Sequence, residues 1–343
     1  MFRLLVACLV GALLVPSQGS PAGVPPDGVD DEEMLQLRSQ FEEFKATYNK
    51  EYEGEEAEED HRFQIFVENL KEARRLQEED RGTAEFGVTK FSDMSDEEFN
   101  QFYLNPLMMN DSSWMQKIAE LPMAEPMANC SVPRQWDWRK KGAVTRVKNQ
   151  GKCAACWAFA SVANIESVWY LKTKRLVSVS EQELLDCDTY DKACRGGYPF
   201  GAFTCAVKLG LMTERRYPYM ARRGRCKAQR SRSVVKIKSY RCIYPHEREM
   251  KTWVATRGPI VVSLNGVLLK SYRGGILRPN SYNCPCNRLN KVVTIVGYGI
   301  QRDIPFWIAR NSWGTNWGEL GYFRIFNGEK ACGLNKLPLT AIA

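Results

Sequence analysis

The chain has 343 residues, which is enough for about two domains with full hydrophobic cores. Its side chains are 44% hydrophobic, 11% aromatic and 26% charged, which excludes collagen, a coiled coil or intrinsic disorder as a description of the whole. The net charge of +8 is unevenly divided: residues 1–130 carry 11 basic and 27 acidic side chains (−16), and residues 131–343 carry 37 basic and 13 acidic (+24). We therefore expect two parts of different fate, held together partly by electrostatics.

The first 19 residues have the features of a secretory signal peptide. Arg3 precedes an apolar run from Leu4 to Val15, and small residues follow Pro16. This run is shorter than the roughly 20 residues that a membrane-spanning helix needs, and we expect no membrane span elsewhere. The protein is therefore predicted to reach a lysosome, a secretory granule or the extracellular space.

Because the chain is predicted to be secreted, its cysteines are candidates for disulfides and two of its sequons are candidates for glycosylation. After loss of Cys8, 11 of the 12 cysteines remain, so disulfides are expected and at least one thiol lacks a partner within the chain. Asn110 and Asn129 begin Asn-x-Ser sequons and are predicted glycosylation sites.

Residues 20–130 begin with a Pro- and Gly-rich leader and continue as a charged, helical region from about Met34 to Asp80. Within this region six residues recur at spacings of 4, 4, 3, 4 and 4, which places them on one face of a helix; they are Glu58, Arg62, Phe66, Asn69, Ala73 and Gln77. Ser95, followed by three acids, is predicted to cap a further helix. Residues 103–130 have no period and are predicted to form an exposed linker that proteases can cut.

The second part of the chain changes from helical to strand-like patterns. A long helix is predicted from Cys156 to about Lys172, and Ser180 opens a second helix that ends near Cys187. Beyond Arg241, β-branched and aromatic runs predict strands; they cover residues 260–264, 292–296, 306–309 and 321–325. Helices followed by strands predict an α+β fold with two subdomains.

The densest chemical signal is the segment from Gln150 to Phe159. Cys156 opens the long predicted helix, where the positive end of the helix dipole stabilises a thiolate. Cys153 and Cys156 could form a dithiol redox pair, could divide into one structural cysteine and one nucleophile, or could both be structural. No βαβ pattern surrounds them, which disfavours a thioredoxin-like redox fold.

This segment resembles the active-site segment of papain-like cysteine proteases, and other motifs agree with the resemblance. Asn311–Gly314 is similar to the family's asparagine segment, and Cys194–Gly197 to its substrate-backbone strand. The helical stripe of residues 58–77 and the segment Gly87–Asp93 are similar to the two propeptide motifs, the first in the variant found in cathepsins F and W. The resemblance implies a papain-like two-subdomain fold, with a helical left subdomain around a central helix and a β-barrel-like right subdomain. A helical inhibitory propeptide would precede it, giving a signal peptide (1–19), a propeptide and linker (20–130) and a peptidase domain (131–343).

The resemblance also implies roles for individual residues. Cys156 would be the nucleophile, and the Gln150 side chain with the Cys156 backbone N–H would form the oxyanion hole. Asn311 would orient the general base, with Trp313 shielding that contact. Gly196 and Gly197 would bind the backbone of the substrate. An apolar side chain of the substrate would be bound by Tyr198, Pro199, Ile260 and Leu337.

Disulfides are implied in the same way. Cys153 would pair with Cys194, Cys187 with Cys226, and Cys284 with Cys332. Four cysteines then lack family partners, namely Cys130, Cys205, Cys242 and Cys286. Because no histidine lies near the pair Cys284 and Cys286, a zinc site is not expected there, and no metal or cofactor is implied.

The family pattern breaks at the general base, where Lys291 stands in place of the catalytic histidine. His61 and His246, the only histidines, lie in the propeptide stripe and at a predicted surface helix start, so neither can substitute. Lysine has a pKa of about 10.4, which would have to fall by roughly 3–5 for it to act as a base at pH 5–7. Ala154 and Ala155 also replace the family's Gly-Ser. We therefore expect a cysteine endopeptidase zymogen with impaired hydrolysis; the alternatives are a non-catalytic pseudoprotease that binds peptides or inhibitors and, more remotely, a thiol–disulfide oxidoreductase.

Residues 215–241 carry 11 basic side chains and no acid. Such a run is either a solvated face or a binding site for polyanions such as sulfated glycans. Nucleic acid is not an expected partner, because the chain is predicted to follow the secretory route. The expected partners are peptide or protein substrates, the chain's own propeptide as an intramolecular inhibitor, and sulfated glycans.

Overall fold

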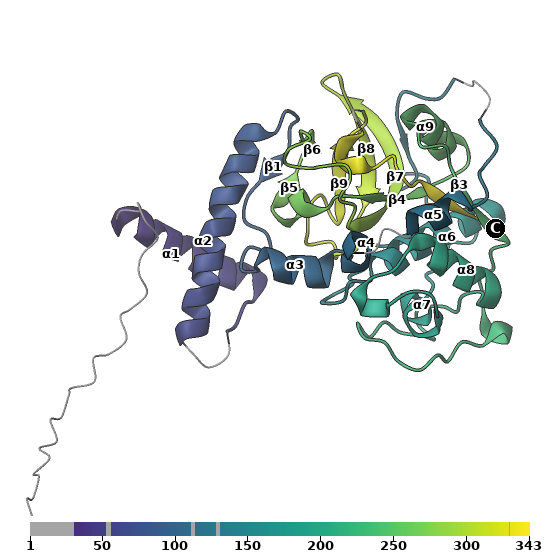
Figure 1. Ribbon diagram of the computed structural model, residues 1–343, viewed down its shortest axis with the longest axis horizontal. Coiled ribbons are helices and arrows are strands. Elements are labelled where there is room, and N and C mark those ends of the chain that lie inside the picture. The colour runs from purple at the N-terminus through teal and green to yellow at the C-terminus, as the bar shows by residue number, and fades with distance from the viewer. Residues whose placement is uncertain (1–30, 53–55, 111–113, 128–130, 329) are drawn as a thin grey trace, which may run out of the picture.

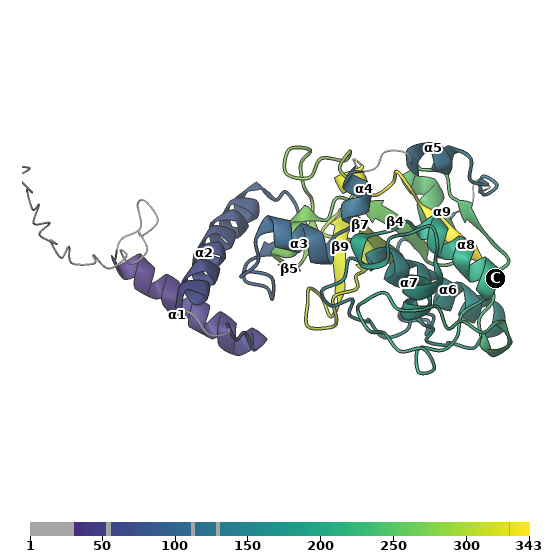
Figure 2. The same cartoon turned by 60° about the horizontal axis from the view of Figure 1, so that its bottom comes forward.

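A computed structural model describes residues 31–52, 56–110, 114–127, 131–328 and 330–343. The predicted signal peptide, the sequon residue Asn129 and Cys130 lie outside these residues, as do two of the three residues of the Asn110 sequon. In both views the helices α1 and α2 project from one end of a larger body, and α3 leads from them onto it (Figure 1, Figure 2). None of the helices described is both long and apolar enough to cross a membrane.

The N-terminal part is helical, as predicted, and its first two helices have a small aromatic core of their own. The helices are α1 (Asp31–Tyr48), α2 (Glu56–Glu79), α3 (Asp96–Tyr103), α4 (Pro106–Asn110) and α5 (Trp114–Ala119). Phe41 and Phe44 of α1 pack against Phe66 of α2, with ring centroids 5.3 and 5.2 Å apart. Ser95 caps α3 in a reciprocal capping box with Glu98, which confirms the predicted helix start.

The prediction of an exposed, irregular linker over residues 103–130 is wrong in part. This segment contains α4 and α5, and it buries Leu104 and Met108. Further along, the Ala124 N–H donates to the Cys242 carbonyl at 2.7 Å, which attaches the segment to a sheet edge. Non-local contacts therefore order a stretch that has no periodic pattern of its own.

The helical subdomain surrounds α6 (Cys156–Thr173), whose residues from Cys156 to Val168 are all buried. Around it lie α7 (Glu181–Cys187) and α8 (Pro199–Leu209), while α9 (Glu247–Thr256) packs on the sheet. Ser180 caps α7 through the Glu183 N–H, so the two helices predicted here are confirmed. Short 3₁₀ turns cover Ala193–Arg195, Arg230–Arg232, Val267–Lys270 and Ala331–Gly333.

A twisted sheet forms the second subdomain. In spatial order its strands are β3 (Ser239–Cys242), β10 (Leu339–Ile342), β4 (Ile260–Leu264), β7 (Lys291–Gln301), β8 (Ile304–Arg310), β9 (Tyr322–Phe326) and β6 (Ile276–Leu277), and β2 (Trp136–Asp137) pairs with β7. The four predicted strands are β4, β7, β8 and β9. The helical subdomain and the sheet have separate hydrophobic cores, which confirms the α+β, two-subdomain prediction.

The N-terminal part also adds a strand to the second subdomain. β1 (Glu85–Phe86) pairs antiparallel with β5 (Tyr272–Gly274), and the Thr89 hydroxyl donates to the Lys270 carbonyl at 2.6 Å. This pairing positions the chain so that α3 and α4 cross the junction of the two subdomains, where α6 begins (Figure 1).

Candidate active site

Cys156 is the first residue of α6, and its side chain is fully buried. The disulfide between Cys153 and Cys194 holds the turn that leads into the helix. Burial raises the pKa of the Cys156 thiol, while the charge of Lys291 and nearby backbone N–H groups act in the opposite direction. Burial has the larger effect, so the protonated thiol is favoured in this structure.

The disulfides of the structure are those that the family resemblance implies. Besides the bridge already named, Cys187 is bonded to Cys226 and Cys284 to Cys332. Within the described residues, the free cysteines other than Cys156 are Cys205, Cys242 and Cys286, and of these three Cys286 alone is exposed. Nowhere in the described part of the chain do three His, Cys, Asp or Glu side chains converge as metal ligands.

Gln150 lies beside the helix start and is also fully buried. Its side-chain Nε2 donates to the Cys153 carbonyl at 2.8 Å and, at 3.3 Å, to the Phe102 carbonyl of α3. Its Oε1 accepts hydrogen bonds from Ser312 Oγ at 2.7 Å and from Lys291 Nζ at 3.2 Å. The amide is therefore fixed in orientation, with its N–H group turned toward the segment that crosses the site.

Lys291 is the first residue of β7, and its side chain is completely buried. Its Nζ donates to the Tyr103 carbonyl at 3.1 Å and to Gln150 Oε1, and it lies 4.1 Å from the centre of the Trp313 ring. Burial lowers the pKa of Lys291 to about 7, the neighbouring Cys156 raises it, and Lys90 lowers it further. All these contacts are ones that an ammonium group prefers: carbonyl oxygens and an aromatic face.

The expectation that Asn311 orients the base is not met. Asn311 Oδ1 accepts from the Ser312 N–H at 2.8 Å, and its buried Nδ2 has no partner among the described atoms. The hydrogen bonds described for Lys291 go to Tyr103 and Gln150, so neither Asn311 nor Cys156 is bonded to it. The Lys291 ammonium is bonded to oxygen atoms of Gln150 and Tyr103 instead, and Asn311 Oδ1 is engaged by the backbone of its own neighbour.

The Trp313 ring contacts Lys291 directly, whereas we expected it to shield a contact between Asn311 and the base. Aromatic rings from the N-terminal part close over it, with Phe91 at 4.9 Å and Phe99 at 5.5 Å between ring centroids. Lys90 donates from Nζ to the Trp313 carbonyl on the same side. A positive charge is therefore placed near Lys291 by the N-terminal part of the chain.

The predicted substrate-backbone strand is occupied by Asn105. The Asn105 Nδ2 donates to the Gly197 carbonyl at 2.6 Å, and its Oδ1 accepts from the Gly197 N–H at 3.3 Å. A Cβ atom on Gly196, whose φ is +106°, would lie 2.2 Å from Asn105 Oδ1. One side-chain amide thus makes both hydrogen bonds that an extended peptide would make to this glycine, a contact that sequence reasoning missed.

The predicted apolar pocket needs one correction. Tyr198, Pro199 and Leu337 lie on the helical side, with Tyr198 and Leu337 buried in the core of that subdomain. Ile260 faces the other way, into the core of the sheet subdomain, and its neighbour Val261 faces Leu337's side. Side chains alternate along a strand, so a shift of one residue in β4 moves the side chain to the opposite face.

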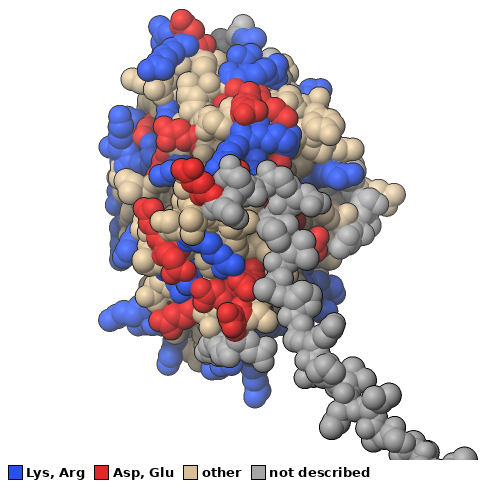
Figure 3. Space-filling view, turned by 90° about the vertical axis from the view of Figure 1, so that its left-hand side faces the viewer, with Lys and Arg blue, Asp and Glu red and all other residues tan. Residues whose placement is uncertain are grey.

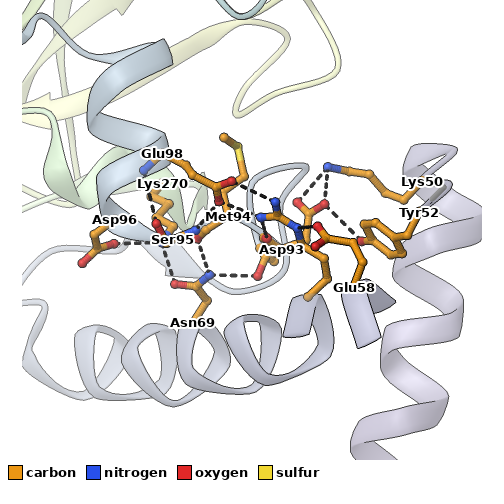
Figure 4. A network of polar contacts seen from close by, with 12 residues as sticks. Lys50, Tyr52, Glu58, Asn69, Asp93, Met94, Ser95, Asp96, Glu98 and Lys270 are labelled. Atoms are coloured by element: carbon orange, nitrogen blue, oxygen red, sulfur yellow. Dashed lines mark hydrogen bonds and ion pairs between the residues drawn. The ribbon is translucent and has the colours of Figure 1, made fainter. Parts of the chain in front are cut away.

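The helical stripe of the N-terminal part binds the segment that follows it (Figure 4). Asn69 Nδ2 donates to the carbonyls of Ser92 and Met94 at 2.8 and 2.9 Å, and its Oδ1 accepts from Lys270 Nζ at 2.7 Å. Lys270, from the second part of the chain, also pairs with Asp96 at 2.8 Å. The stripe is therefore more than an apolar face, because its polar members also fix the backbone of residues 92–94.

Arg62, another member of this stripe, pairs with Glu98 at 2.6 Å and with Glu58 at 2.7 Å. These acids are paired within the N-terminal part, and acidic and basic side chains are interspersed on its outer face (Figure 3). Among the ion pairs whose two residues the structure describes, the pair of Lys270 and Asp96 is the one that joins the N-terminal part to the second part of the chain. Close contact between the two parts thus includes this ion pair and the packing of Phe91 and Phe99 on Trp313.

Known proteins share both parts of this architecture. Residues 132–342 match the domain described as Papain family cysteine protease, and residues 41–99 match the Cathepsin propeptide inhibitor domain (I29). Cathepsin F of Mus musculus is 40% identical over 317 residues, which are 92% of this chain and 67% of that protein. Cathepsin W of Felis catus is 38% identical over 329 residues, which are 90% of this chain and 87% of that protein.

Solved zymogen structures superpose well on the chain. The digestive procathepsin L2 proteinase from Tenebrio molitor larval midgut has a TM-score of 0.81 at 31% identity, covering 90% of this chain and 100% of that one. The recombinant stem bromelain precursor has a TM-score of 0.79 at 31% identity, covering 90% and 99%. The chain therefore belongs to the papain family of cysteine proteases, as a zymogen whose cathepsin-type inhibitory propeptide precedes the protease domain.

Proposed function

We propose that this zymogen yields a cysteine endopeptidase that cleaves peptide bonds through Cys156 but turns over slowly, because Lys291 stands where the family has its histidine. The observation that supports this most directly is the position of the Lys291 ammonium. Its described hydrogen bonds go to the Tyr103 carbonyl and to Gln150 Oε1, and neither reaches Cys156 or Asn311. A residue held in this way can supply positive charge, but it is poorly placed to move a proton between thiol and substrate.

The charge state of Lys291 supports the same conclusion. In the zymogen its pKa is lowered to about 7, largely by burial. At pH 5 a base with that pKa is neutral in roughly one molecule in a hundred. Removal of the propeptide takes away the Tyr103 carbonyl and the neighbouring Lys90, and it admits water. Hydration and the loss of a like charge both raise the pKa of a lysine, so the neutral form becomes scarcer still.

The two halves of the catalytic cycle should therefore differ. A charged Lys291 stabilises the Cys156 thiolate, so attack on the substrate carbonyl can proceed with help from Gln150. Hydrolysis of the acyl-enzyme requires a base to activate water, and the lysine cannot serve while it is protonated. The acyl-enzyme should accumulate.

A non-catalytic pseudoprotease that binds peptides or inhibitors is the alternative. A thiol–disulfide oxidoreductase has less support, because Cys153 is bonded to Cys194 and is not free to pair with Cys156. A pre-steady-state experiment on the processed protein distinguishes the slow endopeptidase from the pseudoprotease. Reaction with an activated peptide ester should release about one equivalent of alcohol in a burst, followed by slow turnover. No burst, with peptide binding intact, would favour the pseudoprotease.

The extent of the parts and the location of the protein belong to the same proposal. We infer a signal peptide over residues 1–19, a propeptide and linker over 20–130 and a peptidase domain over 131–343. The signal peptide would direct the chain to a lysosome, a secretory granule or the extracellular space. Sequencing the N-terminus of the secreted zymogen and of its processed form would test both boundaries.

We also propose that the protease domain binds sulfated glycans through the basic segment 215–241, and that nucleic acid is not its ligand. The support is the unbalanced charge of this segment, which carries 11 basic side chains and no acid. The zymogen should be retained on immobilised heparin, and the salt needed for elution should exceed that expected from its net charge of +8 alone. Elution at physiological salt would contradict the proposal.

A further inference from the structure

The basic segment contains a set of cations without ionic partners. Ten of its basic side chains are exposed, and none has a carboxylate within ion-pairing distance among the described residues; they are Arg215, Arg216, Arg222, Arg223, Arg225, Lys227, Arg230, Arg232, Lys236 and Lys238. Surface arginines of a folded protein commonly find a nearby acid, as Arg62 and Arg75 do in the propeptide. Positive charge is therefore concentrated here without local compensation.

Part of this charge surrounds a cavity of about 630 Å³ beside α7. Six of its lining residues are cationic: Arg216, Arg222, Arg223, Arg225, Lys227 and Arg232. One carboxylate, Asp186, also lines it, and both of its oxygens are occupied. Oδ1 accepts from Gln182 Nε2 at 2.8 Å and from the Gly224 N–H at 2.6 Å, and Oδ2 accepts from the Tyr217 hydroxyl at 2.8 Å. The carboxylate is thus held by neutral donors, and the lining carries six cations against one anion.

The loop that carries these cations is held in place by several contacts. The disulfide between Cys187 and Cys226 attaches it to the end of α7. Gln182, which is itself buried, accepts from the Met220 N–H at 2.8 Å and donates to the Arg222 carbonyl at 2.7 Å. The backbone is therefore ordered before any ligand arrives, which reduces the entropy cost of binding.

We propose that this cavity is a binding site for a sulfated segment of a linear glycan, an inference that rests on the glycan partnership proposed above. Guanidinium groups bind sulfate oxygens through paired N–H donors, and five of the six cations are arginines. A chain of closely spaced sulfates would engage several of them at once. Nucleic acid fits less well, because the aromatic residue of the lining, Tyr217, is buried and offers no open face for base stacking.

The cavity is separate from the substrate cleft. No residue of the propeptide or of the active site lines it, so zymogen and processed protein should bind the glycan alike and without competition from peptides. The same loop also contacts the backbone of the active-site segment, since the Tyr219 hydroxyl donates to the Gln150 carbonyl at 2.8 Å. A glycan can therefore stay bound while Cys156 reacts.

Two triple variants of the full-length zymogen test the location of the site. The cavity variant replaces Arg222, Arg225 and Lys227 by serine, and the matched control replaces Arg230, Lys236 and Lys238, which lie in the same segment outside the cavity. Both lose three positive charges from exposed positions, and thermal unfolding would verify that both remain folded. Affinity is measured by calorimetry for a heparin-derived hexasaccharide.

We expect the cavity variant to lose at least tenfold in affinity and the control less than threefold. Equal losses of affinity in both variants would overturn the assignment of the cavity as the binding site and would leave a diffuse glycan-binding segment. No binding by the parent would overturn the proposal that the protein binds sulfated glycans. The de-N-sulfated hexasaccharide and inorganic sulfate should bind at least tenfold more weakly than the hexasaccharide. A single-stranded DNA of equal charge that matches its affinity would overturn the assignment to sulfated glycans.

Discussion

Lys291 Nζ lies 3.1 Å from the carbonyl oxygen of Tyr103, which closes α3 just after the matched propeptide domain and belongs to the propeptide that we propose over residues 20–130. The same nitrogen is bonded to Gln150 at 3.2 Å and lies over Trp313, with no water-exposed surface. Propeptide binding and the charge of the active site are therefore coupled in this zymogen.

The first prediction concerns replacement of Lys291 by histidine. Because imidazole has a pKa near the working pH and a shorter reach, it can exchange protons with Cys156 and approach Asn311. Steady-state hydrolysis of a fluorogenic peptide by the processed variant should exceed that of the parent by about 10²–10⁴-fold near pH 5.5.

The parent's residual rate should climb toward alkaline pH as Lys291 loses its proton, and the variant's should not. Lys291→Met, which has neither charge nor base, provides the control and should be inactive at every pH. A parent that already turns over at the variant's rate near pH 5 would contradict the mechanism.

The second prediction is a pH dependence of propeptide affinity. The pKa of Lys291 is lowered from 10.5 to about 7 in the zymogen, so between these values the complex binds fewer protons than the free domain. Binding of an added propeptide to the processed domain should therefore tighten as pH rises above 7, by up to about tenfold per pH unit. Below pH 7 both forms carry the proton, and this contribution disappears.

Fluorescence anisotropy of a labelled propeptide measures the effect without relying on turnover. Lys291→Met should bind with a flatter pH profile between 7 and 9. Identical slopes for parent and variant would assign the dependence to another group.

The third prediction concerns access to Cys156. The thiol is fully buried in the zymogen, and burial raises its pKa, so iodoacetamide should label it very slowly. After propeptide removal, water enters and a charged Lys291 stabilises the thiolate, so labelling at pH 5.5 should be at least 100-fold faster. Mass spectrometry of the peptide containing Cys156 follows the reaction, and the exposed Cys286 serves as an internal reference that should not change. Equal labelling before and after processing would show that the propeptide does not close the site.

The fourth prediction tests the mimicry by Asn105. Its two hydrogen bonds to Gly197 are buried, so Asn105→Ala should weaken propeptide binding by about 1–3 kcal/mol, or roughly 5- to 150-fold in affinity. Gln101→Ala, which changes an exposed polar residue of α3 four positions before Asn105, is the matched control and should change affinity less than twofold. Competition binding of the two variant propeptides to the processed domain compares them, and equal effects would contradict the role assigned to Asn105.

The fifth prediction concerns the acid stability of the propeptide. Hydrogen bonding by Arg62 lowers the pKa of Glu98, so this pair contributes stability above the ordinary glutamate pKa that is lost as pH falls through the folded value. Arg62→Met should destabilise the zymogen by about 1–2 kcal/mol at pH 7, and by progressively less as the pH approaches 3. Urea unfolding followed by tryptophan fluorescence would measure this, and a deficit that persists undiminished at pH 3 would exclude Glu98 as its origin.

Local signals in the sequence determined much of the architecture. Ser95 and Ser180 mark helix starts because a hydroxyl satisfies the free N–H groups of the first turn, and this requirement depends on neighbouring residues alone. The stripe on α2 follows from helical geometry in the same way. The sequence alone also shows that Lys291 stands where the family has its general-base histidine.

Only the tertiary structure decided where long or alternating side chains point. Lys291 is bonded to Gln150 and Tyr103, and the latter is 188 residues away in the chain. Asn105 contacts Gly197 across 92 residues, although it lies in a segment without periodicity. Such contacts depend on how distant elements pack together, on the reach of a rotamer and on strand register, and none of these is encoded by a local pattern.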